Sequence, residues 1–250
     1  MSIFAVGDLH LSLSLPKPMD VFGGEWEGYV EKIRLGFASA GIAAEDTVVL
    51  CGDISWAMNI REALEDFRFI DALPGKKIFL KGNHDYWFET AAKTRRFFEE
   101  NSLAGFAILN NNHYEIETDA GLVAVCGTRG WLNPETGTGK LTDEEIALNI
   151  KVSAREVIRL ENSLKSASDH SAKTGVSFAE TLCFLHYPPV LGSDANSEMI
   201  AVLHKYGIRR CYFGHVHGKH KKLAPRSPVG GISYSLVSAD NINFTPVRVI

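Results

Sequence analysis

The sequence predicts an α/β fold built from layered, mixed β-sheets. Short β-branched or aliphatic runs alternate with segments of helical periodicity along most of the chain, and such alternation is typical of helices packed on sheets. Near the C-terminus, residues 230–237 and 243–249 both have strand-like patterns, and no helical pattern lies between them. Because strands without a helical crossover are commonly antiparallel, we expect both strand directions in the sheets.

Five apolar runs predict buried strands, and polar residues follow each of them. The runs span residues 2–6, 47–51, 77–80, 181–185 and 211–213. The polar residues that follow are, in the same order, Gly7-Asp8, Gly52-Asp53, Gly82-Asn83-His84-Asp85, His186 and Gly214-His215. Since strand ends in α/β sheets converge on a common ligand crevice, we expect these residues to meet in space.

Four segments are predicted to be helices: residues 29–40, 60–73, 142–168 and 196–206. The first two place their apolar side chains on one face, as helices that cover a core do. Thr142 and Glu145 have the spacing of a capping box, which marks the start of the long, charge-rich third helix. Residues 127–140 contain four of the 22 glycines and no clear periodicity, and they predict a long loop.

The chain has 250 residues, enough for one sizeable core, and we interpret residues 1–250 as a single domain. Apolar residues make up 45% and charged residues 22%, as in an ordinary globular protein that is not embedded in a membrane. The formal net charge of -4 does not favour nucleic acid as a partner. Neither a signal peptide nor a membrane-spanning run is expected, so we predict a cytoplasmic protein.

The four cysteines do not have the spacing of a metal or redox site. Each lies in an apolar, strand-like stretch, and no Cys-x-x-Cys motif is present. Small, buried thiols in a reducing compartment are therefore expected at the four positions: Cys51, Cys126, Cys183 and Cys211.

The polar clusters at the strand ends have the composition of a metal site. Aspartate, asparagine and histidine form a mixed oxygen and nitrogen set, which suits Mn, Fe, Zn, Co or Ni better than Ca or Mg. Asp8 and His10 are two residues apart, so in an extended segment both side chains can reach one ion. The same holds for His215 and His217, unless a turn splits them between two ions.

The order of these motifs resembles that of the calcineurin-like metallophosphoesterase superfamily. The matching motifs are Asp8-x-His10, Gly52-Asp53, Gly82-Asn83-His84-Asp85, His186 and Gly214-His215-x-His217. They extend from residue 8 to residue 217 and so cover most of the chain. The resemblance implies a four-layer αββα sandwich, with two mixed sheets flanked by helices and a bimetal site at the strand ends.

The resemblance also implies a role for each residue. Asp8, His10 and His217 are expected to bind one divalent ion, and Asn83, His186 and His215 the other. Asp53 is expected to bridge the two ions, with Mn or Fe favoured and Zn as a third choice. His84 is the expected catalytic residue outside the ligand set, and Asp85 is expected to orient its ring.

The expected reaction is hydrolysis of a small phosphomonoester or phosphodiester, nucleotide-like in type. A hydroxide bridging the two ions would attack phosphorus, and His84 as imidazolium would stabilise a phosphoryl oxygen or protonate the leaving oxygen. Two alternatives stay open, a nuclease acting on DNA or RNA and a metal-binding scaffold without catalysis. The sequence does not indicate the oligomeric state.

Particular residues bear on the substrate. Protein Ser/Thr phosphatases of this superfamily carry Gly-Asp-x-Val-Asp-Arg-Gly, whereas this chain has Ile54-Ser55-Trp56 after its Gly-Asp. Purple acid phosphatases place a tyrosine ligand where Trp56 stands. Arg129 and Trp131 follow a predicted strand at residues 122–126, and we predict that they bind substrate by a phosphate fork and by stacking. No function is predicted for the remaining histidines: His113, His170, His204 and His220.

Overall fold

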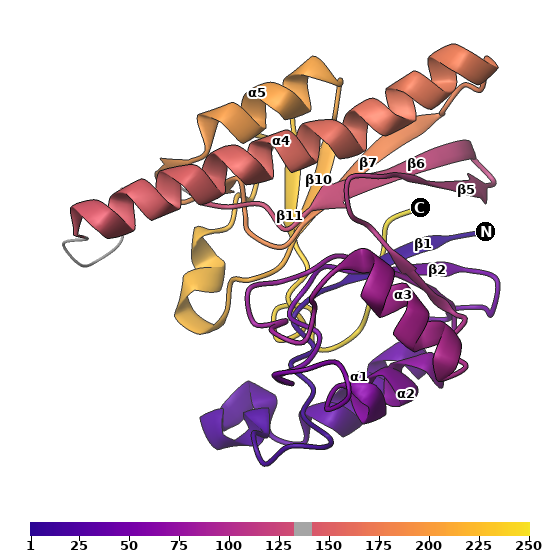
Figure 1. Ribbon diagram of the computed structural model, residues 1–250, viewed down its shortest axis with the longest axis vertical. Helices are drawn as coiled ribbons and strands as arrows, with labels where there is room; N and C mark the ends of the chain where they lie inside the picture. Colours follow the sequence, from indigo (N-terminus) through magenta and orange to yellow (C-terminus); the bar gives the residue numbers. More distant parts are fainter. Residues whose placement is uncertain (133–141) are drawn as a thin grey trace.

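The computed structural model describes residues 1–132 and 142–250. Two sheets are stacked face to face, and helices cover the outer face of each (Figure 1). One helical layer consists of α1 (Tyr29–Ser39), α2 (Leu64–Asp71) and α3 (Ala91–Glu100). The opposite layer consists of α4 (Asp143–Thr174) and α5 (Ser197–Lys205). The predicted four-layer αββα sandwich is confirmed.

Both sheets are mixed, as expected. The first has the order β12-β1-β2-β3-β4, and all of its pairs are parallel except β12 with β1. Its strands are β1 (Ile3–Val6), β2 (Thr47–Leu50), β3 (Lys76–Phe79), β4 (Phe106–Ile108) and β12 (Val247–Arg248). The antiparallel β12 brings the C-terminus beside the N-terminus, where the Ile3 amide donates to the Ile250 carbonyl at 3.1 Å (Figure 1).

The second sheet has the order β11-β10-β7-β6-β5, and only the β5–β6 pair among its described strands is antiparallel. Its strands are β5 (Tyr114–Thr118), β6 (Gly121–Thr128), β7 (Glu180–Leu185), β10 (Arg210–Phe213) and β11 (Ser233–Leu236). Short elements in the connections are β8 (Val190–Leu191), β9 (Asp194–Ala195), η1 (Met19–Phe22), η2 (Gly24–Trp26) and η4 (Gly218–Leu223).

The alternation of side chains along each strand creates the layers. In β1, Ile3 and Ala5 point into the core between the two sheets, whereas Phe4 and Val6 point toward the helices α1–α3. Residues of β6 and β7 alternate in the same way between the inter-sheet core and the core beneath α4 and α5. Strands buried on both faces explain why these segments have near-continuous apolar runs.

The structure corrects several predicted boundaries. The third predicted helix ends at Thr174 rather than near residue 168, because Gly175 supplies the left-handed C-cap with φ 76°. The predicted strand at residues 243–249 shrinks to β12, since Asn243 and Phe244 adopt positive φ and form a turn. The helix α3 and the strands β4 and β5 were not predicted. The predicted loop at residues 127–140 starts after β6, and residues 133–141 lie outside the described part of the chain.

Candidate metal centre

The loops that follow β1, β2, β3, β7 and β10 meet at one edge of the sandwich. These strands are neighbours within their sheets, so their carboxyl ends deliver polar side chains to the same place. The seven predicted ligands all lie there: Asp8, His10, Asp53, Asn83, His186, His215 and His217. Asp8, His10, Asp53 and His186 are at most 3% exposed, so charged groups are concentrated in a space nearly closed to bulk water.

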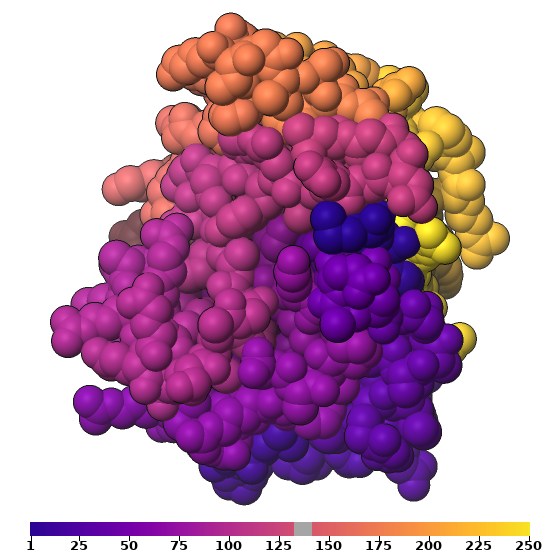
Figure 2. All heavy atoms as spheres, turned by 90° about the vertical axis from the view of Figure 1, so that its right-hand side faces the viewer, coloured from indigo at the N-terminus to yellow at the C-terminus, as the bar shows by residue number. Residues whose placement is uncertain are grey.

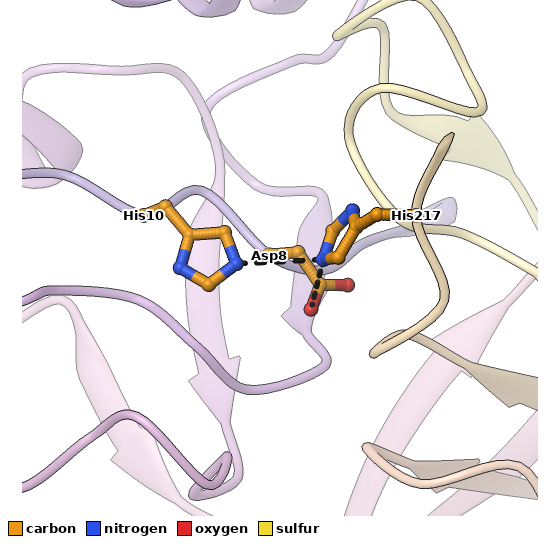
Figure 3. Close-up of side chains that lie close together, drawn as sticks. All are labelled: Asp8, His10 and His217. Carbon is orange, nitrogen blue, oxygen red and sulfur yellow. Dashed lines mark hydrogen bonds and ion pairs between the residues drawn. The ribbon is translucent and has the colours of Figure 1, made fainter. Parts of the chain in front are cut away.

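Asp8, His10 and His217 form the first cluster (Figure 3). The His217 Nε2 lies 3.4 Å from the Asp8 Oδ1 and 3.4 Å from the His10 Nε2. All three residues therefore aim a ligand atom at one point, within 4.8 Å of each other. Two imidazole nitrogens and a carboxylate oxygen at these separations are the donors that a transition-metal ion prefers.

Asp53, His186 and His215 form the second cluster, with Asn83 beside it. The His186 Nδ1 lies 3.0 Å from the carbonyl oxygen of Cys51, to which it can only donate. A neutral His186 ring then carries no proton on Nε2, which faces the Asn83 Oδ1 at 2.7 Å. Two acceptors turned toward one another are satisfied by a cation between them.

Asp53 lies between the clusters. Its Oδ2 is 3.8 Å from the His10 Nε2 of the first cluster and 3.5 Å from the His186 Nε2 of the second. Its Oδ1 accepts the backbone N–H of His84 at 2.8 Å, which holds the carboxylate in this orientation. Asp53 thus faces the ligand atoms of both clusters, whereas Asp8, 3.8 Å from His186, approaches the Nδ1 that already donates to Cys51.

The backbone at these loops is held in uncommon conformations. Asp8, His10, Asp53 and His215 all have positive φ, between 48° and 70°, a region that few non-glycine residues occupy. Such strain is concentrated at functional sites because the surrounding fold must enforce it. Gly82 lets the backbone of its loop lie directly against Asp53, because a side chain at position 82 would collide with Asp53.

The electrostatics of the centre favour a bound cation. Burial, together with the negative charges of Asp85 and Asp8, raises the pKa of Asp53 to about 7. Burial also lowers the pKa of His10 and of His215 to about 3, so both rings are neutral and keep a lone pair for a metal. Divalent cations would offset the repulsion between the buried carboxylates, and the donor set fits them.

The comparisons with known proteins agree with this geometry. The family model described as calcineurin-like phosphoesterase matches residues 1–219. The chain belongs to that family. No curated protein matches the chain.

Two solved structures share the fold of this family member at low sequence identity, and a third is similar at a lower TM-score. A phosphopantetheinyl hydrolase from Mycobacterium tuberculosis is 12% identical, with a TM-score of 0.57, and the match covers 100% of this chain and 95% of that one. The TT1561 protein of Thermus thermophilus is 12% identical, with a TM-score of 0.51 and coverage of 94% and 87%. The AQ665 protein from Aquifex aeolicus, of unknown function, is 13% identical, with a TM-score of 0.48 and coverage of 99% and 95%.

A carboxylate outside the predicted set supports the first cluster of this phosphoesterase. The buried Asp240 lies 2.8 Å from the His217 Nδ1 through its Oδ1, and the Lys221 ammonium lies 3.3 Å from its Oδ2. Burial opposes a charged His217, but the Asp8 charge and the Asp240 hydrogen bond outweigh it and raise the pKa of His217 to about 10. Asp240 follows β11, so the strand-end rule that identified the ligands also applies to it.

His84 lies at the rim of the centre. Its ring is partly exposed, its Nε2 lies 4.0 Å from the Asp53 Oδ2, and its Nδ1 is buried without a partner among the described residues. The ring packs on Trp56, with centroids 4.4 Å apart. Burial lowers the pKa of His84, so the ring is expected to be neutral near pH 7 rather than an imidazolium.

The structure gives Asp85 a different role from the predicted one. Its Oδ1 accepts N–H groups from the Ile54 backbone at 2.8 Å, the Ser55 backbone at 3.2 Å and the Trp87 indole at 2.9 Å. Its Oδ2 accepts the Gly82 amide at 2.7 Å. These four donors saturate the carboxylate, and no hydrogen bond to the His84 ring is found among the described residues. Asp85 joins the loops that carry Asp53 and Asn83.

Replacing Asp85 with asparagine is expected to lower the free energy of unfolding by about 2–4 kcal/mol, because the amide group cannot accept all four buried donors. Urea unfolding of the metal-free protein measures this loss. The fully exposed Asp119→Asn is the matched control and should change little. An unchanged unfolding free energy in Asp85→Asn, together with a shifted pH–rate profile, would restore the predicted orienting role.

Arg129 and Trp131 lie beside the second cluster, but their contacts are largely internal. The Arg129 guanidinium is 3.3 Å from the fully buried Glu156 and lies over the Trp131 ring, 5.1 Å from its centroid. The Trp131 ring packs on Tyr187 at 4.7 Å, and Tyr187 packs on His215 at 4.0 Å. The Arg129 carbonyl also accepts the His186 amide at 3.0 Å. These contacts position the second cluster.

Proposed function

We propose that this protein is a phosphoester hydrolase that depends on two divalent metal ions. The observation that carries the proposal is the pair of clusters that share Asp53, in a chain of the calcineurin-like phosphoesterase family. Asp8, His10 and His217 would hold one ion. Asn83, His186 and His215 would hold the other. The mixed oxygen and nitrogen donors favour Mn or Fe, with Zn as the third choice.

When bound, the two ions supply positive charge for a phosphoryl group and make a water molecule more acidic. The chain supplies orientation and a hydrogen-bond donor. His84 stands at the rim of the centre with its Nε2 directed toward Asp53 at 4.0 Å, and as a neutral imidazole it can donate one N–H to a phosphoryl oxygen there. Asp240 holds the His217 ring through Nδ1, which leaves Nε2 directed toward Asp8.

We place the organic part of the substrate in a cavity of about 520 Å³ beside the first cluster. Aromatic and apolar side chains form much of its wall: Met19, Phe22, Trp26 and Trp56. Phe22 is 70% exposed and extends this apolar wall to the surface, where the organic part of a ligand would cover it. A small phosphate ester with a ring or an apolar group, nucleotide-like in type, suits this cavity.

A second, basic cavity of about 340 Å³ adjoins Arg129. Lys81, Arg155 and Arg159 line it together with Arg129, and Glu156 balances only part of their charge. This surplus of positive charge favours substrates that carry a further anionic group. In this arrangement Trp131 supports Arg129 and does not stack on the substrate.

A nuclease is the second candidate. A groove of about 760 Å³ lies beside the metal centre, and four cationic residues line it: Lys219, Lys221, Lys222 and Arg226. It shares Gly218 and Lys219 with the cavity at the first cluster, so a polyanionic strand could follow it to the metals. The net charge of -4 weighs against this candidate. Incubation with labelled DNA and RNA oligonucleotides separates the two.

Chelation is expected to lower hydrolysis of p-nitrophenyl phosphate or its bis-ester at least about a hundredfold, with recovery on adding Mn, Fe or Zn. Rate and metal content per chain are measured together. Less metal should be needed as the pH rises from about 6 to 8, because a bound ion must displace the His217 proton. A chain with two ions that hydrolyses nothing on a wide phosphoester panel contradicts the proposal and favours the scaffold alternative.

The proposed compartment is the cytoplasm. All four cysteines are buried free thiols, as expected where disulfides do not form. None of the described helices is long and apolar enough to cross a membrane.

A further inference from the structure

A third group of metal-ligating side chains lies where the end of α4 meets the edge strand β5. His113 immediately precedes β5, Glu115 lies within it, and His170 lies in the last turns of α4. In Figure 1 the orange end of α4 lies above β5 at the edge of the second sheet, and in Figure 2 orange atoms rest on the magenta atoms below them. Glu156 reaches Thr128 near the metal centre, and His170 lies roughly 21 Å further along the helix axis. The third group is therefore separate from that centre.

The three side chains converge through their ligand atoms. The Glu115 Oε1 lies 3.2 Å from the His113 Nε2 and 3.0 Å from the His170 Nε2. All three ligand atoms lie within 4.8 Å of one another. Around a tetrahedral zinc ion with bonds of about 2.0–2.1 Å, ligand atoms lie roughly 3.3 Å apart. The two distances from the Glu115 oxygen are close to that value.

The hydrogen bonds of Ser166 determine which nitrogen of His113 carries the proton. The Ser166 hydroxyl donates its only hydrogen to the Ser163 carbonyl at 2.8 Å, so it accepts from the His113 Nδ1, also at 2.8 Å. In the neutral ring, Nε2 is then unprotonated and faces the Glu115 carboxylate. Two acceptors at 3.2 Å need a cation between them, or a proton on the ring.

We propose that His113, Glu115 and His170 bind a divalent transition-metal ion such as Zn²⁺. Two imidazoles and one carboxylate form a three-residue set that Zn²⁺ takes in open sites, with water in the fourth position. The side chains are 13%, 31% and 36% exposed, so an ion and its water have access from solvent. Ser166 holds the His113 ring as the outer partner of a metal ligand does.

The bound ion would join α4 to the edge of the second sheet. Its ligands come from two elements that are distant in sequence, so binding stabilises only the folded arrangement. This site stands independently of the proposed hydrolase activity. Loss of its ion is expected to leave hydrolysis unchanged.

The test is Zn²⁺ binding to the full chain at pH 8, where free imidazoles are neutral. Equilibrium dialysis and metal analysis are expected to find three ions per wild-type chain but two in His170→Ala and in Glu115→Gln. Saturating Zn²⁺ should raise the Tm of wild type above that of His170→Ala by roughly 5–10 °C. His204→Ala, which removes an exposed histidine outside the three groups, is the control and should behave as wild type.

The ion counts distinguish failure of the third metal site from failure of the proposed hydrolase centre. If the proposed hydrolase centre does not bind metal, wild type holds one ion, and that ion is still lost in His170→Ala. If His170→Ala and Glu115→Gln bind as many ions as wild type, with the same shift in Tm, the third site is refuted. An ion count that falls in His204→Ala also refutes it, because the loss would not then depend on this cluster.

Discussion

Asp53→Asn is expected to lower kcat/KM for phosphoester hydrolysis at least about a thousandfold, equivalent to about 4 kcal/mol of transition-state stabilisation. The Asp53 carboxylate faces His10 at 3.8 Å and His186 at 3.5 Å, so it is shared by both clusters. An amide lacks the charge that two closely spaced cations require between them. Steady-state kinetics and metal content, measured on one preparation, check the result, and we expect fewer than two ions per chain.

Asp46→Asn is the matched control for this change. Asp46 is a buried aspartate that accepts backbone N–H groups, but it lies at the opposite end of β2 from Asp53. Its replacement should cost stability and leave both metal content and the hydrolysis rate close to wild type. If Asp53→Asn retains both ions and the full rate, Asp53 is not the bridging ligand.

His84→Asn is expected to lower kcat about 10²–10⁴-fold while both metal ions remain bound. The ring lies at the rim of the centre, 35% exposed, with its Nε2 4.0 Å from the Asp53 carboxylate. These features fit a donor to substrate better than a structural ligand. Kinetics at saturating metal, with the ions counted in the same sample, separate a lost donor from a lost metal.

His204→Asn makes the same chemical change at an exposed position on α5, and its rate should equal that of wild type. A rate for His84→Asn within a factor of about three of wild type would show that the ring takes no part in the chemical step. A large loss accompanied by loss of a metal ion would instead place His84 among the ligands.

Much of the fold was predictable because its signals are local. Apolar runs predicted β1, β2, β7 and β10, and the capping box of Thr142 and Glu145 marked the start of α4. The α3 helix was missed because its buried side chains include Thr94 and few apolar residues in regular order. In β5, half-buried and exposed side chains alternate at residues 114–118, which is an edge-strand signal that the apolar-run criterion did not detect.

The candidate site was predictable to the same extent and for the same reason. Each ligand follows a strand, and strand ends in a layered α/β fold converge. Asp85 was predicted to orient the His84 ring because the two residues are adjacent in sequence. Its carboxylate instead turns toward Gly82, Ile54 and Ser55. Adjacency in sequence also gave no indication of Asp240, because its partner His217 lies on a different loop.

The sequence by itself determined the types of candidate ligand, their order and the strands that carry them, because these depend on each residue and its neighbours in the chain. Only the tertiary structure decided which side chains meet. It placed Asp53 between two clusters, turned Asp85 into a link between loops, and brought His113 beside His170. The physical reason is that contacts between distant segments depend on strand register and on helix packing across a whole layer. In the candidate centre first inferred from strand ends, the sequence therefore indicated the candidate ligands, and the packing of the two sheets brought them together.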